Sequence, residues 1–196
     1  MAGKMDRRAL VGAVLAGRGA AVVVAGLGAP AWDITAAGDT VLNMPLWGGM
    51  GGAAMVGLGL ALAQPERPVL VITGDGEMLM GLGALATIAV QRPSNLAILV
   101  LDNERYGETG MQETATAQGV DLIGVAVAAG FGRTMSMTTT EDAPGLWEAL
   151  RAGGPVFALA KVSDAPAPLV LPPREGAYLQ ARLREGLLGP DSFAQR

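Results

Sequence analysis

Short continuous apolar runs alternate along this chain with longer apolar segments of helical length. The clearest runs cover residues 69–73 and 96–101, and each ends in a polar tip. Runs without polar alternation are typical of strands buried on both faces of a covered parallel sheet. Further candidate strands cover residues 21–25, 41–44, 133–137 and 155–162.

The segments between these runs have the composition of helices. Helices are predicted over residues 5–16, 53–63, 78–91, 122–129, 146–152 and 175–188. Asp121 is placed to cap the helix over residues 122–129, and Gly130 to end it. Residues 32–39 are expected to be irregular. Alternating strands and helices predict an α/β fold, a doubly wound parallel sheet with right-handed connections.

Residues 104–119 are polar and lack periodicity, so they are predicted to form a loop, of the kind that carries function on a rigid scaffold. Four side chains in this loop are candidates for contact with a cofactor or substrate, although solvation would explain them equally well: Tyr106, Glu108, Thr109 and Gln112.

One domain is predicted over residues 1–162. Residues 163–196 are predicted to be a Pro-rich C-terminal arm and helix, packed on the same domain or on a partner. The amino terminus imitates a secretory signal, but Arg18 interrupts its apolar stretch. No uninterrupted run of about 20 apolar residues exists, so no transmembrane helix is expected. We expect a cytoplasmic protein.

Composition narrows the chemistry. The net charge of the 196 residues is −4, which does not indicate a basic surface for binding nucleic acid. The chain has no Cys and no His, which excludes disulfides, thiolate sites and imidazole bases. Acid–base chemistry must therefore use carboxylates, a cofactor or another chain.

Oxygen ligands follow the two clearest strands. Gly74-Asp75-Gly76 comes after residues 69–73, and Asn103 comes after residues 96–101. A strand–helix–strand unit brings both tips to the carboxyl edge, where open α/β sheets bind ligands. Carboxylate and amide oxygens suit Mg²⁺, which also takes oxygens of a bound phosphate. The alternative, that both residues only shape turns, stays open.

The flanking residues favour a phosphorylated ligand. Gly74 and Gly76 have no side chain to block close backbone approach. The helix that opens near Glu77 offers free N–H groups and the positive end of its dipole to phosphate oxygens. The predicted metal would thus bridge the protein and a phosphorylated cofactor.

At this spacing, and ahead of Tyr106-Gly107, Gly-Asp-Gly and Asn resemble the metal–diphosphate motif of thiamine diphosphate enzymes. The resemblance implies that Asp75 and Asn103 bind Mg²⁺ through their side chains and Arg105 through its backbone carbonyl. The residues of this region expected at the cofactor are Gly74, Asp75, Gly76, Glu77, Asn103, Arg105, Tyr106 and Gly107.

A glycine cluster at residues 48–52 precedes the predicted helix over residues 53–63. A dinucleotide fingerprint would need an acid about 20 residues later on a second strand tip, and none occurs there. In thiamine diphosphate enzymes a similar Trp-Gly-x-hydrophobic-Gly segment lines the cofactor. The resemblance implies that Met50 supports its bent conformation and that the Gly48 carbonyl meets the aminopyrimidine, with Gly49 also at the cofactor. The alternative is that Met50 packs in the core.

Residues 22–162 resemble the diphosphate-binding subunit of the sulfopyruvate and phosphonopyruvate decarboxylase group. The resemblance implies a subunit of a hetero-oligomer that decarboxylates a 2-oxo acid. An alpha-type partner would supply the pyrimidine-binding domain and the Glu that activates the cofactor. No catalytic residue is expected in this chain.

The sequence departs from this group at residues 113–119, where many relatives carry a His and this chain does not. Recognition of a sulfonate or phosphonate would want Arg or Lys, and only Arg105 lies near the motif, so an apolar or aromatic 2-oxo acid stays open. Two other functions are also open. One is a carboligase of the acetolactate synthase type, and the other is a non-catalytic structural or regulatory subunit with a vestigial cofactor site.

Overall fold

The computed structural model describes residues 4–193. Its main sheet has six parallel strands in the order β2-β1-β3-β4-β8-β7. These strands are β1 (Val22–Ala25), β2 (Asn43–Pro45), β3 (Val69–Gly74), β4 (Leu96–Asp102), β7 (Arg133–Met137) and β8 (Val156–Lys161). A small antiparallel pair is formed by β5 (Arg105–Tyr106) and β6 (Gln112–Glu113). The predicted parallel α/β sheet is confirmed.

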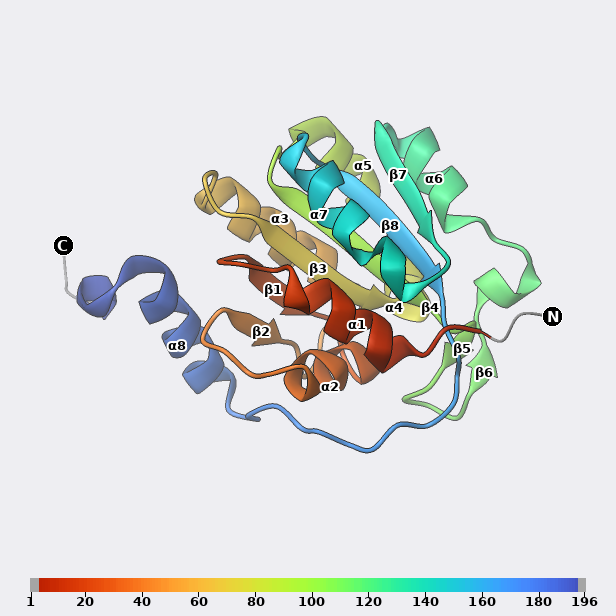
Figure 1. The fold of residues 1–196 in the computed structure, drawn as a ribbon, viewed down its shortest axis with the longest axis horizontal. Coiled ribbons are helices and arrows are strands. Elements are labelled where there is room, and N and C mark those ends of the chain that lie inside the picture. Colours follow the sequence, from red (N-terminus) through yellow and green to blue (C-terminus); the bar gives the residue numbers. More distant parts are fainter. Residues whose placement is uncertain (1–3, 194–196) are drawn as a thin grey trace.

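Helices cover both faces of the sheet (Figure 1). One face carries α1 (Arg7–Ala16), α2 (Ala29–Ala36) and α7 (Ala143–Arg151). The other face carries α3 (Ala53–Ala63), α5 (Ala84–Gln91) and α6 (Leu122–Ala129). Each layer packs its own hydrophobic core against alternate strand residues, so the residues of β3 and β4 up to Thr73 and Asp102 are almost entirely buried. That double burial explains why these strands read as continuous apolar runs.

The predicted helix over residues 78–91 is wrong as a single element. The chain forms α4 (Asp75–Met80), turns through Gly81-Leu82-Gly83 and then forms α5. At the turn the backbone of Gly81 meets the backbone of Gly51, and a Cβ on Gly81 would lie 2.1 Å from the Gly51 carbonyl oxygen. Glycine is a poor helix former, and here it permits a contact that a continuous helix would not make.

Residues 32–39, expected to be irregular, are also different in the structure, because α2 covers most of them. Pro30 lies in the first turn of α2, a position where its fixed φ favours a helix. Residues 104–119 are not a simple loop either. They contain the β5–β6 pair and a 3₁₀ turn, Ala115–Gln118.

The C-terminal segment leaves β8 and crosses the molecule without regular structure before α8 (Gly176–Leu188), which lies beside the edge strand β2 (Figure 1). Arg182 of α8 forms an ion pair with Asp39 at 2.6 Å. Trp47 Nε1 donates a hydrogen bond to the Pro173 carbonyl at 2.8 Å. The segment therefore covers a sheet edge that would otherwise be exposed. Among the described helices, none has the length and hydropathy to cross a bilayer.

Candidate functional site at the carboxyl edge of the sheet

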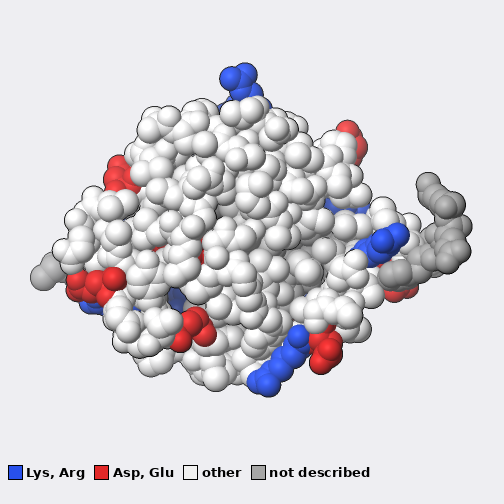
Figure 2. Space-filling view, turned by 180° about the vertical axis from the view of Figure 1, so that it is seen from behind, with Lys and Arg blue, Asp and Glu red and all other residues white. Residues whose placement is uncertain are grey.

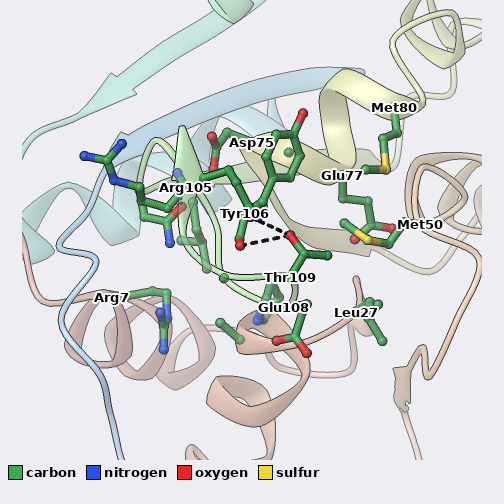
Figure 3. Close-up of a pocket in the computed structure, with 18 residues that line it drawn as sticks. Arg7, Leu27, Met50, Asp75, Glu77, Met80, Arg105, Tyr106, Glu108 and Thr109 are labelled. Carbon is green, nitrogen blue, oxygen red and sulfur yellow. Dashed lines mark hydrogen bonds between the residues drawn. The ribbon is translucent and has the colours of Figure 1, made fainter. Parts of the chain in front are cut away.

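A cavity of about 300 Å³ opens at the carboxyl ends of β1, β3 and β4. The sheet order reverses here, since β2 lies on one side of β1 and β3 on the other. Ligands of open α/β sheets bind at this switch point. Figure 3 shows Arg7 and Arg105 on one side of the cavity and Met50, Met80 and Leu27 on the other. The two arginines thus lie opposite an apolar side of the cavity, next to which Figure 3 also places Glu77.

Asp75 is the first residue of α4 and follows β3 directly. Its side chain lines the cavity, yet the residue is only 1% exposed. Oδ2 accepts hydrogen bonds from the hydroxyls of Thr114 at 2.5 Å and Thr116 at 3.1 Å. Burial raises the pKa of Asp75, and these hydroxyls oppose the rise only in part. A buried carboxylate with few partners favours a cation beside it.

The two threonines belong to the 3₁₀ region after β6, and sequence reasoning did not single them out. The Thr116 hydroxyl also contacts Asp102 Oδ1 at 2.8 Å, so it joins the ends of β3 and β4. Asp102 forms an ion pair with Lys161 of β8 at 2.8 Å. No periodic or motif signal marks either threonine, because their partners lie in distant segments of the chain.

Asn103 follows β4 and lines the same cavity as Asp75, as predicted from the strand order. Its Oδ1 accepts a hydrogen bond from the Arg105 backbone N–H at 3.0 Å, which turns the chain into the β5–β6 pair. The guanidinium of Arg105 pairs with Glu113 at 2.9 Å. The side chain of Arg105 is therefore occupied, while the predicted role of this residue concerns only its carbonyl.

Tyr106 packs against the Gly-Asp-Gly turn. A Cβ on Gly76 would lie 2.5 Å from the Tyr106 ring, so only glycine fits beneath it. The β5–β6 connection places its other candidate residues, Gly107, Glu108, Thr109 and Gln112, along the cavity as well. The connection thus forms one wall of the site, above the end of β3.

Glu77 also lines the cavity, and its residue is 4% exposed. Oε1 accepts a hydrogen bond from the N–H of Ala53, the first residue of α3, at 3.3 Å. Oε2 is buried without a hydrogen-bond partner among the described residues. Burial is the principal cause that raises the pKa of Glu77. The carboxylate therefore lies between the ends of β1 and the start of α3, next to Gly26.

The glycine cluster before α3 contributes one side chain to the cavity. Met50 lines it, whereas Gly48 and Gly49 are exposed and do not. Gly49 and Gly51 have positive φ of 70° and 93°, conformations that favour glycine. Met80, which is 56% exposed, lies on the same apolar side. The predicted cofactor role of Gly48 and Gly49 stays a prediction.

Arg7 is a cavity residue that sequence reasoning missed. It begins α1, far from the motif in sequence, and its guanidinium pairs with the fully buried Asp33 of α2. The sequence offered no signal, because an Arg at the start of an amphipathic helix is ordinarily a solvated residue. The cavity is therefore lined by a second arginine in addition to Arg105.

Glu104, which follows Asn103, links the amino-terminal segment to β8. It forms ion pairs with Lys161 of β8 and with Lys4, each at 2.7 Å, and these lysines lower the pKa of Glu104 from 4.5 to about 2. A lowered pKa in the folded state means that ionised Glu104 favours folding. This contribution to stability is complete above pH 4.5 and is lost as the pH falls toward 2.

Glu104→Gln is therefore expected to lower the free energy of unfolding at pH 7 by about 1 kcal/mol or less, because the ion pairs are partly exposed. Urea unfolding at pH 7, 5 and 3 should show a deficit that shrinks as the solution becomes more acidic. Glu66→Gln is the control, since Glu66 forms no ion pair within residues 4–193. A deficit that is constant across this pH range would contradict the assignment.

The donor set can be tested against a magnesium–diphosphate group. Within the described residues, no three His, Cys, Asp or Glu side chains cluster as metal ligands. The predicted ligand set for a metal here has one carboxylate, that of Asp75, and otherwise neutral oxygens. Mg²⁺ binds in this way, through one or two carboxylates together with phosphate oxygens and water. Gly74, where a Cβ would meet nothing within 4 Å, leaves room for a ligand at the end of β3. The residues that line the cavity therefore fit a magnesium–diphosphate group.

Known proteins with similar sequences include several decarboxylases. Over 146 residues the chain is 41% identical to sulfopyruvate decarboxylase subunit beta of Methanothermobacter thermautotrophicus, covering 74% of this chain and 76% of that subunit. It is 38% identical over 177 residues to phosphonopyruvate decarboxylase of Streptomyces hygroscopicus, covering 90% of this chain and 41% of that protein. Sulfopyruvate decarboxylase of Methanosarcina acetivorans is 41% identical over 130 residues, and the match spans 33% of its length.

Solved structures show the same fold. The thiamine diphosphate-dependent 4-hydroxybenzoylformate decarboxylase of Rhodococcus jostii superposes with a TM-score of 0.67 at 21% identity, over 83% of this chain and 33% of that one. Residues 25–158 match the family described as thiamine pyrophosphate enzyme, C-terminal TPP binding domain. The chain therefore belongs to the thiamine pyrophosphate enzyme family.

Proposed function

We propose that this chain is the diphosphate-binding subunit of a thiamine diphosphate- and Mg²⁺-dependent decarboxylase of 2-oxo acids. The observation that carries the proposal is the cavity at the switch point of the sheet, where Asp75 and Asn103 lie at the ends of neighbouring strands. The relatives reported above, sulfopyruvate and phosphonopyruvate decarboxylases, support the same reaction.

Six residues of the cavity have a defined part in this proposal. Asp75 and Asn103 hold Mg²⁺ with their side-chain oxygens, and Arg105 adds its backbone carbonyl. Gly74 and Gly76 admit the diphosphate close to the backbone, at the start of α4. Met50, on the apolar side of the cavity, supports the ring system. Thiamine diphosphate, when bound, supplies the electron sink that decarboxylation of a 2-oxo acid requires.

A partner chain completes the site in this proposal. The relative from Methanothermobacter is named a beta subunit, whereas the matches span only 33% and 41% of the relatives from Methanosarcina and Streptomyces, whose names mention no subunit. Figure 2 shows a broad central area without Lys, Arg, Asp or Glu on the face that α3, α5 and α6 cover. Its large exposed apolar residues are Met55, Val56, Leu62, Val90 and Val127. An uncharged face of this kind marks an association surface, and we assign it to the alpha-type, pyrimidine-binding subunit.

Calorimetric titration of thiamine diphosphate with Mg²⁺ tests the proposal, first with this chain alone and then with its partner subunit. We expect the partner to tighten binding sharply and the mixture to release CO₂ from a 2-oxo acid. Product analysis separates an aldehyde from a carboligation product. Absence of cofactor binding in both samples would overturn the proposal and favour a vestigial site.

A further inference from the structure

Arg7 has a geometry that the proposed function does not use. Its guanidinium contacts both oxygens of Asp33, through Nε and through Nη2, the latter at 3.5 Å. Asp33 is fully buried, and the Arg7 side chain is 11% exposed. The remaining nitrogen, Nη1, makes no hydrogen bond to any residue from 4 to 193. The side chain is therefore held in place while one donor stays available.

The charges around Asp33 do not cancel. Arg8 Nε also contacts Asp33, at 3.0 Å, so two guanidinium groups share one carboxylate. The cluster of Arg7, Arg8 and Asp33 therefore has a net charge of +1. Of its two arginines, only Arg7 lines the cavity. Arg105 also lines the cavity, but Glu113 and Asp164 already pair with it. Arg7 is thus the better placed of the two lining arginines to receive an anion.

The position within the cavity narrows the choice of anion. Arg7 lies on the side opposite Met50 and Met80 in Figure 3. In the proposed function Met50 supports the ring system, where the substrate reacts, and Asp75 marks the diphosphate end. An anion at Arg7 would therefore lie on the side of the cavity away from the ring system, which favours the diphosphate over the substrate.

We propose that Arg7 is an oxyanion-binding residue that contacts the terminal phosphate of the cofactor, held for that purpose by Asp33. The inference rests on the proposed function, because it needs thiamine diphosphate in this cavity. Fixed guanidinium donors form strong charge-assisted hydrogen bonds with phosphate, and little side-chain freedom is lost on binding when the donor is already held.

The test compares Arg7→Met with Arg8→Met in the enzyme assembled with its partner. Both variants remove one guanidinium from Asp33, and both residues border a separate surface hollow with Lys4 and Ser163, but only Arg7 also lines the cavity. Calorimetry with Mg²⁺ should show that Arg7→Met raises the Kd of thiamine diphosphate by about 10- to 100-fold. Arg8→Met should leave it within about twofold, as expected for a site without ligand contact.

Thiamine monophosphate, measured by displacement of thiamine diphosphate, identifies the phosphate. It lacks the terminal group, so Arg7→Met should leave its Kd nearly unchanged and reduce the preference of the enzyme for the diphosphate. Equal weakening by both variants would overturn the proposal, because the effect would then come from Asp33 or from the separate hollow. An unchanged cofactor Kd with a raised KM for the 2-oxo acid would also overturn it, by assigning Arg7 to the substrate. If even the unmodified enzyme binds no thiamine diphosphate, the proposed function fails, and the inference with it.

Discussion

Asp75→Asn is expected to weaken Mg²⁺-dependent binding of thiamine diphosphate by at least about 100-fold. Mutation of a residue that only hydrogen-bonds to a metal ligand already lowers metal affinity by up to about 100-fold. Asp75 is the only carboxylate in the proposed ligand set, and an amide offers the metal a neutral oxygen instead. The substitution keeps the size of the side chain and an acceptor for the hydroxyls of Thr114 and Thr116.

The same variant should make the ligand-free protein more stable at pH 7. Burial raises the pKa of Asp75 in the folded state, so folding stabilises the protonated carboxyl. That contribution is present at acidic pH and is lost as the pH rises through the folded pKa. A neutral Asn does not incur the cost of a buried charge. Thermal unfolding without ligand at pH 7 should therefore give a higher Tm for Asp75→Asn, and the difference should shrink toward pH 4.

Asp121→Asn is the matched control, since it makes the same change at the exposed cap of α6, where Asn serves as well as Asp. It should alter neither Tm nor cofactor binding. Retention of Mg²⁺-dependent binding by Asp75→Asn would contradict the metal-site assignment. A lower Tm would instead show that the carboxylate has a structural role.

Gly81→Ala is expected to lower the free energy of unfolding by about 2 to 3 kcal/mol, as overpacking does when no rotamer can relieve it. The new Cβ would lie 2.1 Å from the Gly51 carbonyl oxygen and 2.9 Å from its carbonyl carbon. Both are backbone atoms, so the segment with Met50 must move. We expect the Kd of thiamine diphosphate to rise by about 10- to 100-fold, equivalent to 1.4 to 2.8 kcal/mol.

Gly83→Ala separates this contact from the general effect of alanine in the turn. Gly83 has φ −61° and ψ −20°, and a Cβ there would meet nothing within 4 Å. Its free energy of unfolding should stay within about 1 kcal/mol of the unmodified protein. Urea unfolding and calorimetry of both variants check the pair. Similar behaviour of the two would mean that the contact between Gly81 and Gly51 does not position the Met50 segment.

Several features of the site could be predicted because their signals are local. The continuous apolar runs over residues 69–73 and 96–101 indicate strands buried on two faces, and the polar tips follow directly. Once the strands are parallel, Asp75 and Asn103 must share an edge, as they do in the structure. The caps of α6 at Asp121 and Gly130 are equally local and are confirmed.

The sequence by itself thus determined the sheet, its ligand-binding edge and the residues at the strand tips, because periodicity and turn chemistry act over a few neighbouring positions. Tertiary structure alone decided which distant groups meet there. The hydroxyl of Thr114 reaches Asp75 across 39 positions, and Arg7 reaches Asp33 across 26. The contact between Gly81 and Gly51 lies where the helix that the apolar pattern favours is interrupted. Such contacts follow from how whole elements pack, and no repeating pattern in either partner segment marks them.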